Sequence, residues 1–343
     1  MFTYSIRVHL MNSVARSYLE KVILLIQNNN MRLIKKPSEI APKSTISVLV
    51  YGEPGIGKTT IACSAPNPVL FDYDGGVQRI NGAHQVPTLQ PTSWEDTNAA
   101  IEEIEREMPE VQTIVIDTAG KMLDYMSAYI IKNNPKMKKF DGSLSLQGYG
   151  VRKSMFVDFI NRLSIMGKNV IFVAHEKEEK RGEEWVKRPE IGGSSAADLI
   201  KELDLVGYMR AIGKQRTIAF NPTEAYYAKN TCSLPEVEAI PVVVDEKGEA
   251  TGTNNYFSLV IDRYNQYQIA KQQKTADYAE LMDVIEGMIV ECKDAETLNE
   301  VLDKLGTIEH IYNSKLIAGR MLNKKASELG FKFDKLSKAY VNA

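Results

Sequence analysis

STISVLVYGEPGIGKTT, Ser44 to Thr60, opens as an apolar stretch and ends in a glycine-rich run that closes on Lys58 and Thr59. The first part is rich in β-branched residues and stops at a glycine, which predicts a buried strand. The run from Gly52 to Thr59 matches the pattern GxxxxGK[ST], and a short helix is predicted directly after it. Strand, glycine loop and helix in this order are the context in which the pattern cradles phosphate groups.

This loop predicts a site for ATP and Mg²⁺. Its glycines let successive backbone N–H groups curl around phosphate oxygens. Lys58 is expected to reach the β- and γ-phosphates, the Thr59 hydroxyl to bind Mg²⁺, and Thr60 to contact the α-phosphate. A glycine turn without a ligand is the alternative, and it is disfavoured because strand, loop, Lys-Thr pair and helix all agree. The predicted nucleotide-binding residues are Gly52, Glu53, Pro54, Gly55, Ile56, Gly57, Lys58, Thr59 and Thr60.

The rest of the chain alternates strand and helix patterns, which predicts an α/β fold with a mostly parallel central sheet covered on both faces. Beyond Glu202, two consecutive strand patterns with a tight connection, LDLVGYMRAIG and KQRTIAFNP, predict an antiparallel end to the sheet. From about Gln272 the pattern is almost entirely helical. Further predicted strands are Pro68 to Phe71, Val111 to Ile116 and Asn169 to Ala174; predicted helices are Glu95 to Met108 and Ser154 to Met166.

The composition bounds the kind of protein. Of 343 residues, 44% are hydrophobic and 25% charged, the balance of an ordinary soluble globular protein. The net charge is -2, so a nucleic-acid contact needs a local basic patch. Three scattered cysteines without a CxxC pair argue against disulfides and zinc and for a reducing cytosol. No apolar run approaches the length of a membrane span, so no membrane contact is expected.

Four segments are expected. They are an N-terminal extension over 1–43, a nucleotide-binding core over 44–235, a connecting hairpin and helix over 236–271, and a basic helical region over 272–343. Met31 directly follows the NNN of Asn28 to Asn30. Residues 1–30 therefore read equally as an upstream extension of the reading frame or as a helix.

Within the last 33 residues, seven basic residues stand against two acidic ones, with aromatics between them. A nucleic-acid or partner surface and a helical cap with its own small core are both open.

Two strand ends supply candidate carboxylates. Asp117 ends the strand TIVID and is expected to contact Mg²⁺ through water; a cap of the next helix is the alternative. Many P-loop ATPases carry a catalytic glutamate directly after this aspartate, but here Thr118 follows, so the water-positioning carboxylate must come from elsewhere. In VLFDYDGG, Asp72 and Asp74 close a strand expected to lie beside the P-loop strand. Asp74 is preferred because two glycines follow it; Asp72, or a solvated DGG turn, is the alternative.

His175 ends the buried strand NVIFVA, whose carboxyl end is expected to open toward the same crevice. A neutral imidazole there is expected to hydrogen-bond the γ-phosphate or the attacking water, and so to report whether ATP or ADP is bound. The alternative is a strand-end histidine whose polar atoms are satisfied within the fold.

This combination of motifs resembles a RecA-type ATPase core. More specifically, GEPGIGKTT, FDYDGG, TIVIDTAG, NVIFVAHEKEE, LDLVGY and AYYAKN resemble phage-encoded RecA-like recombination ATPases, the RecA-core group of Sak-type single-strand annealing proteins. The resemblance covers roughly Ser44 to Pro235. It implies that Asp74 is the catalytic acid, where the family usually has glutamate, and that His175 is the sensor, where RecA itself has glutamine. The shorter side chain of Asp74 leaves slow hydrolysis open, since a misplacement of about 1 Å costs on the order of a hundredfold in rate.

The same resemblance implies two DNA-facing segments and a contact between subunits. The first segment, KNNPKMKKFDGSLSLQGY from Lys132 to Tyr149, offers cations for phosphates and aromatics for base stacking; a mobile solvated loop is the alternative. The second, Glu176 to Gly193, mixes five basic with six acidic residues and reads equally as a solvated hairpin. In a ring or filament of identical subunits, a basic residue would reach the neighbour's phosphates; surface ion pairs are the alternative. The DNA-binding candidates are Lys136, Lys138, Lys139, Phe140 and Tyr149; the candidates for the neighbour's site are Lys229 first, then Arg216 and Arg210.

The leading hypothesis is therefore an ATPase, stimulated by single-stranded DNA, that anneals or pairs strands in phage-type recombination in the cytoplasm of a bacterial host. A homo-oligomer, with a single-strand-binding protein or a helicase as a further partner, is expected. Two alternatives stay open. One is a P-loop loader or motor that acts on a protein such as a helicase, and the other is a nucleotide-gated scaffold with little hydrolysis.

Overall fold

The computed structural model describes residues 33–192, 200–213 and 215–343. The ambiguous segment 1–30 lies outside the described residues. The chain divides into two compact units, one formed by residues 43–268 and the other by the two ends of the chain, up to residue 42 and from residue 269 onward. The domain boundaries expected from the sequence stay predictions. No helix in the described part of the chain has the length and apolarity needed to cross a membrane.

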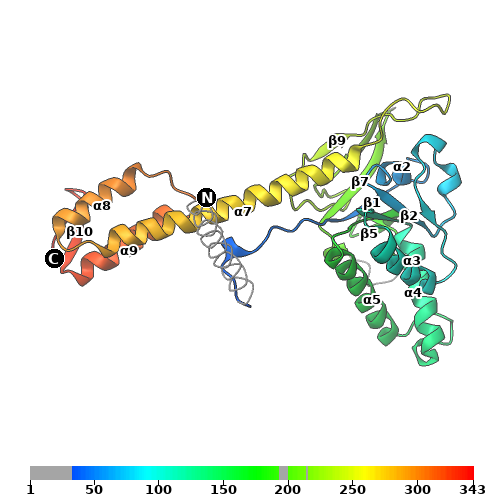
Figure 1. Ribbon diagram of the computed structural model, residues 1–343, viewed down its shortest axis with the longest axis horizontal. Helices are drawn as coiled ribbons and strands as arrows, with labels where there is room; N and C mark the ends of the chain where they lie inside the picture. Colours follow the sequence, from blue (N-terminus) through cyan, green and yellow to red (C-terminus); the bar gives the residue numbers. More distant parts are fainter. Residues whose placement is uncertain (1–32, 193–199, 214) are drawn as a thin grey trace, which may run out of the picture. The chain divides into compact units, whose positions relative to one another are not determined.

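Residues 43–268 are built around a nine-stranded sheet, as far as the described residues go (Figure 1). Its order is β3-β2-β4-β5-β1-β7-β8-β9, with β6 paired to β5 outside this path. The first six strands in this order run parallel, and β8, β9 and β6 are antiparallel to their neighbours. The predicted α/β fold with a mostly parallel sheet is confirmed. The strands are β1 (Ser47–Gly52), β2 (Pro68–Asp72), β3 (Thr88–Leu89), β4 (Thr113–Asp117), β5 (Asn169–Arg181), β6 (Glu184–Pro189), β7 (Leu205–Ile212), β8 (Gln215–Ala219) and β9 (Val237–Ala239).

One expected neighbour relation is wrong. The strand that ends at Asp72 does not lie beside the P-loop strand, because β4 and β5 lie between β2 and β1. All five residues of β4 and the first six of β5 are buried, as an interior place in a sheet covered on both faces requires. β1 lies between β5 and β7, and Gly52 is paired with His175 on β5.

The two faces of the sheet are covered by different helices. On one face, Leu49 and Tyr51 of β1 join a core with α3 (Trp94–Glu107), α4 (Ala119–Asn133) and α5 (Leu146–Ile165). On the other face, Val48 and Val50 join a core with α2 (Lys58–Ala62) and the first turns of α7 (Tyr256–Val290). Figure 1 shows α3, α4 and α5 gathered on one side of the sheet. The alternation of side chains along β1 is what lets one buried strand serve both cores.

Three elements have bounds that differ from the expected ones. α5 begins at Leu146 rather than Ser154, because the Ser145 hydroxyl accepts a hydrogen bond from the Gly148 N–H and caps the helix. β5 continues past the predicted Ala174 and forms a hairpin with β6. α7 begins at Tyr256, well before Gln272. Short 3-10 helices are η1 (Pro37–Glu39), η2 (Val77–Arg79), η3 (Gly82–His84) and η4 (Pro135–Met137).

The last residues of the chain are not helical as expected. After α8 (Ala295–Thr307) and α9 (Ser314–Glu328), the strands β10 (Phe331–Asp334) and β11 (Ala339–Asn342) pair antiparallel. Gly330, with a φ of 85°, ends the helical run in a backbone conformation open to glycine. Phe333 and Tyr340 pack edge to face, and Tyr340 is buried in a core shared with α8 and α9. Part of the aromatic content of this region therefore serves its own core.

The first turn of α7 is expected to be a stability hot spot. Phe257 is fully buried in the core that contains α2, and its backbone N–H donates to the Ser64 hydroxyl at 2.8 Å. Phe257→Ala should lower the free energy of unfolding by about 3–5 kcal/mol, because it leaves a large cavity. Urea unfolding measures this. Leu259→Ala, at a half-exposed position two residues on, should change it by less than about 0.5 kcal/mol; equal costs would contradict the assignment.

Candidate functional site

The glycine loop lies at the carboxyl end of β1 and leads directly into α2. At the end of β1, a Cβ on Gly52 would lie 2.2 Å from the Met209 carbonyl oxygen, so only glycine fits there. Gly57, the residue before α2, has a φ of 94° and turns the chain into the helix. The buried Lys58 ammonium donates to the Gly52 and Glu53 carbonyls, at 3.0 and 2.7 Å. Burial lowers the pKa of Lys58, while the nearby Asp117 carboxylate opposes this. The Lys58 ammonium is therefore held by the loop carbonyls and largely removed from water.

Thr59 and Asp117 form the pair of oxygens expected for Mg²⁺. The Thr59 hydroxyl donates to Asp117 Oδ2 at 2.6 Å. Burial raises the pKa of Asp117, the Thr59 hydrogen bond opposes this, and the carboxylates of Asp72 and Asp74 add to the rise. No cluster of three or more His, Cys, Asp or Glu residues in the described part of the chain could hold a metal ion. A magnesium ion here would therefore rely on nucleotide phosphates and water for its other ligands, as Mg²⁺ commonly does.

Asp72 and Asp74, the two candidates for the water-positioning carboxylate, have different surroundings in the structure. The Asp72 carboxylate is used within the fold, because it accepts the N–H groups of Gly76 and Val77 at 2.8 and 3.0 Å. Asp74 lines the cavity in front of the glycine loop instead. Among the described residues, Asp74 accepts no backbone hydrogen bond comparable to those of Asp72, so it is the better candidate to act on a ligand.

His175 lies beside Asp74 in the lining of this cavity, which measures about 150 Å³. Its Nε2 is 3.9 Å from Asp74 Oδ2, and its buried Nδ1 has no hydrogen-bond partner among the described residues. A histidine satisfied by its own fold, the alternative from the sequence, does not match this geometry. The cavity thus brings Lys58, Thr59, Asp74, Asp117 and His175 to one place from four segments of the chain.

Sequence reasoning missed Arg79, which also lines this cavity. It ends η2, the short helix whose start is fixed by the Asp72 carboxylate. The signal was present in DYDGGVQR, where a basic residue follows five positions after Asp74. A guanidinium at this rim adds a second positive group to the phosphate side of the cavity.

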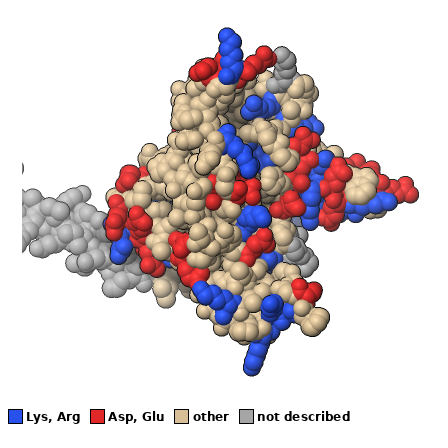
Figure 2. Space-filling model, turned by 90° about the vertical axis from the view of Figure 1, so that its right-hand side faces the viewer, with Lys and Arg blue, Asp and Glu red and all other residues tan. Residues whose placement is uncertain are grey.

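The DNA-binding candidates lie on a small projecting loop between α4 and α5. Met137 and Leu144 anchor it in a core with Ile130, and a bridge pairs Lys138 with Leu144. The lysines and Phe140 are exposed, and the Phe140 side chain is fully so. Tyr149 differs: it is half-buried at the start of α5, with the Arg152 guanidinium 4.8 Å from its ring centroid. On the face in Figure 2, acidic and basic side chains are interspersed, so a nucleic-acid contact would depend on local groups.

The second predicted segment is the β5–β6 hairpin. Lys187 pairs with Glu176 and Glu178, at 2.6 and 2.9 Å, so much of its charge is neutralised internally. Trp185 is 61% exposed near the hairpin's tip. β5 itself runs from His175 at the cavity directly into this hairpin.

The three residues predicted for a neighbour's site have different surroundings. The Lys229 ammonium donates to the backbone carbonyls of Lys201 and Leu203. Arg210 lies over the ring of Tyr226, 5.6 Å from its centroid. Arg216 lies against the glycine loop of its own chain: a Cβ on Gly57 would be 2.8 Å from its Nη1. Their role between subunits stays a prediction.

A mostly parallel sheet, a glycine loop at the end of β1 and the Thr59–Asp117 pair define a P-loop nucleoside triphosphatase. Residues 44–232 match the AAA_24 family, described as an AAA domain. The match spans more than half of the chain, which therefore belongs to this family. The chain is also 24% identical over 285 residues to the SPbeta prophage-derived uncharacterized protein YorG of Bacillus subtilis (strain 168), covering 75% of this chain and 84% of that protein.

Proposed function

We propose that this protein is an ATPase that acts on single-stranded DNA in phage-type recombination, by annealing or pairing strands. The observation that carries the DNA half is the loop between α4 and α5, which presents a fully exposed Phe140 among exposed lysines. Base stacking beside phosphate-binding cations is what sequence-tolerant single-strand binding needs. Similarity to a prophage-derived protein supports the phage setting.

The ATPase half rests on the cavity. Lys58 and the loop N–H groups would hold the phosphates, and Thr59 and Asp117 would hold Mg²⁺, which neutralises phosphate charge when bound. Asp74 would orient the attacking water, since it lies at the cavity and its carboxylate is not taken by backbone donors. His175 would sense the γ-phosphate with the nitrogen that faces Asp74.

β5 offers a direct link between the two halves. It carries His175 at one end of its buried part and then continues as the exposed hairpin with Trp185. A shift of His175 on loss of the γ-phosphate would therefore move a strand that reaches the surface. Assembly into a ring or filament, with a single-strand-binding protein or helicase nearby, belongs to the same proposal.

The test is steady-state ATP hydrolysis with and without single-stranded DNA, with Lys58→Ala as the blank. We expect DNA to stimulate turnover in the wild-type protein and not in the variant. Phe140→Ala should weaken single-stranded DNA binding by about 1–3 kcal/mol, the cost of one lost base stack. Leu146→Ala is the matched control, because Leu146 is exposed near the same loop but cannot stack on a base. Turnover indifferent to DNA, or equal effects of the two loop variants, would contradict the DNA half.

A second candidate is a loader that acts on a protein partner such as a helicase. The observation in its favour is the C-terminal unit, which has its own core and still exposes large apolar side chains, including Leu316 and Leu336. Turnover that ignores DNA but responds to a purified helicase, and loses that response in the full-length Leu316→Glu, Leu336→Glu double variant, would favour the loader. A nucleotide-gated scaffold would instead bind ATP tightly with turnover near background.

A further inference from the structure

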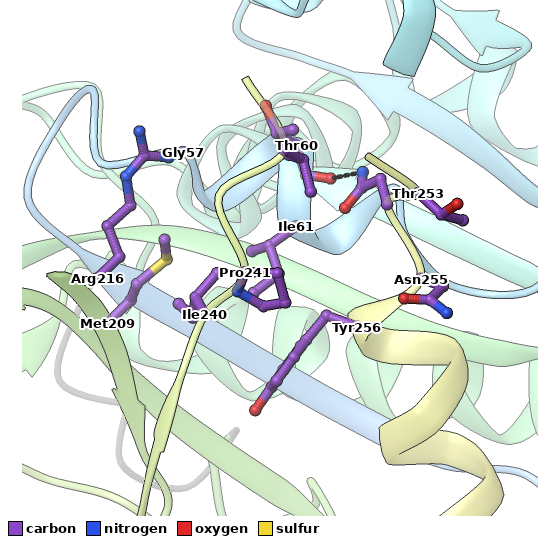
Figure 3. A pocket seen from close by; sticks show the side chains of 12 residues that line it. Gly57, Thr60, Ile61, Met209, Arg216, Ile240, Pro241, Thr253, Asn255 and Tyr256 are labelled. Atoms are coloured by element: carbon purple, nitrogen blue, oxygen red, sulfur yellow. Dashed lines mark hydrogen bonds between the residues drawn. The ribbon is translucent and has the colours of Figure 1, made fainter. Parts of the chain in front are cut away.

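Arg216 lies close to the glycine loop, and a role for it there rests on the ATP-binding half of the proposed function. Arg216 lies on β8, which is antiparallel to β7, itself the neighbour of the P-loop strand β1. Its backbone is fixed on both sides: Arg216 is paired with Ala211, and its carbonyl accepts the Ile240 N–H at 2.9 Å. The side chain then reaches back to the glycine loop. A Cβ on Gly57 would lie only 2.8 Å from Nη1, so the guanidinium touches the loop (Figure 3).

Among the described residues, the Arg216 guanidinium has no anionic partner. In the part of the chain that the structure describes, it makes neither a hydrogen bond nor an ion pair. Other arginines here are engaged: Arg263 forms a two-pronged pair with Glu238 at 2.6 and 2.8 Å. A guanidinium held beside a phosphate-binding loop, with its five donors unused, matches an oxyanion that the loop itself would bring.

The pocket beside Arg216 is small. Met209 lies beside Arg216 at one end of a small pocket, and Ile240, Pro241 and Tyr256 lie toward the other (Figure 3). The pocket measures about 10 Å³, the space of a single water molecule. A nucleobase does not fit there. The pocket shares Gly57 and Thr60 with the cavity lined by Asp74 and His175, so both adjoin the glycine loop.

We propose that Arg216 binds the phosphates of the nucleotide held in the glycine loop of its own chain. This differs from the role expected from the sequence, in which Arg216 would reach the phosphates of a neighbouring subunit. An intrachain arginine of this kind makes phosphate binding independent of assembly. It also leaves the subunit contact to other residues.

The first arm of the test measures ATP binding in the presence of Mg²⁺ by isothermal titration calorimetry, on the full chain. Arg216→Gln should weaken ATP binding about 10- to 100-fold, the loss of charge-assisted hydrogen bonds, and Arg216→Lys should recover part of it. Arg106→Gln, a surface arginine on α3 paired only with the adjacent Glu107, should bind ATP as the wild type does. Wild-type affinity in Arg216→Gln would overturn the proposal.

The second arm separates action within the chain from action between chains. Equal amounts of Lys58→Ala, which keeps Arg216, and Arg216→Gln, which keeps the loop, are mixed and titrated with ATP. We expect no sites of wild-type affinity in the mixture. Their appearance would show that Arg216 serves a neighbour and would overturn the proposal. Both arms measure ATP binding in the absence of DNA. If ATP binding depends on Arg216 but DNA has no effect on turnover, the proposed function is refuted and the proposal for Arg216 is not.

Discussion

Asp117→Asn is expected to reduce Mg²⁺-dependent ATP turnover about a thousandfold while leaving the protein folded. The loss follows because the amide removes the negative charge that faces the metal, and metal stabilisation of this kind is worth several kcal/mol, at about 1.4 kcal/mol per tenfold in rate. Asparagine keeps an oxygen that can accept the Thr59 hydroxyl, which donates to Asp117 at 2.6 Å. Steady-state turnover with Mg²⁺ in excess measures the effect.

Although Asp117→Asn should lower ATP turnover, it is expected to stabilise the nucleotide-free protein against unfolding. Burial, with Asp72 and Asp74 nearby, raises the folded-state pKa of Asp117 above its ordinary value of about 3.9. The folded chain then holds the proton more tightly than the unfolded chain. The stability this contributes is fully present below the ordinary pKa and is lost as the pH rises through the raised one. Asp117→Asn should therefore unfold at higher urea than the wild type at neutral pH, and the difference should shrink toward pH 4.

Two results would contradict this account. Unchanged turnover would remove Asp117 from the metal site. Lost turnover together with a less stable nucleotide-free fold would assign Asp117 a structural role, such as holding Thr59 at the start of α2. A matched control is Asp141→Asn: Asp141 caps the exposed loop between α4 and α5, where Ser143 hydrogen bonds lower the pKa of its carboxyl. Its substitution should leave ATP turnover without DNA unchanged.

The local elements around the nucleotide were predictable from the sequence because each depends on neighbouring residues. β-branched runs made β1 and β4, and the glycines and Lys-Thr pair placed the turn into α2. The order of the strands was not predictable in this way. Whether β2 pairs with β1 or lies two strands away depends on how later segments, β4 and β5, fill the space between them.

Tertiary packing also explains the remaining differences between the predicted and the observed elements. The helix predicted from Ser154 begins at Leu146, inside the segment that was expected to face DNA up to Tyr149. A Cβ at Gly148 would lie 2.8 Å from the Leu144 side chain, so glycine is there for a close contact rather than for flexibility. For Arg216, the resemblance implied a contact with a neighbour's phosphates, but the sequence held no information on what the side chain lies against. In the structure the pairing of β8 with β7 places it beside the glycine loop of its own chain.

Asp74→Ala is expected to reduce ATP turnover about 100- to 1,000-fold with ATP binding retained, because a group that orients the attacking water acts on the chemical step. Asp72 gives the contrast. Its carboxylate holds the N–H groups of Gly76 and Val77, so Asp72→Ala should lower the free energy of unfolding by about 1–3 kcal/mol, and Asp74→Ala should not. A destabilised Asp74→Ala with normal specific turnover would assign the carboxylate to the fold instead.

Asp74→Glu tests whether the aspartate side chain, one methylene shorter than glutamate, limits the rate of ATP turnover. Asp74 Oδ2 lies 3.9 Å from His175 Nε2, a gap that an added methylene would narrow. If the aspartate holds the water about 1 Å too far from the phosphate, the glutamate should raise turnover, by up to about a hundredfold. If the turn at Gly75, with its φ of 66°, already brings the backbone closer to the phosphate, the longer side chain should overreach and lower turnover. A rise would mean that the short reach of Asp74 itself limits the rate of hydrolysis.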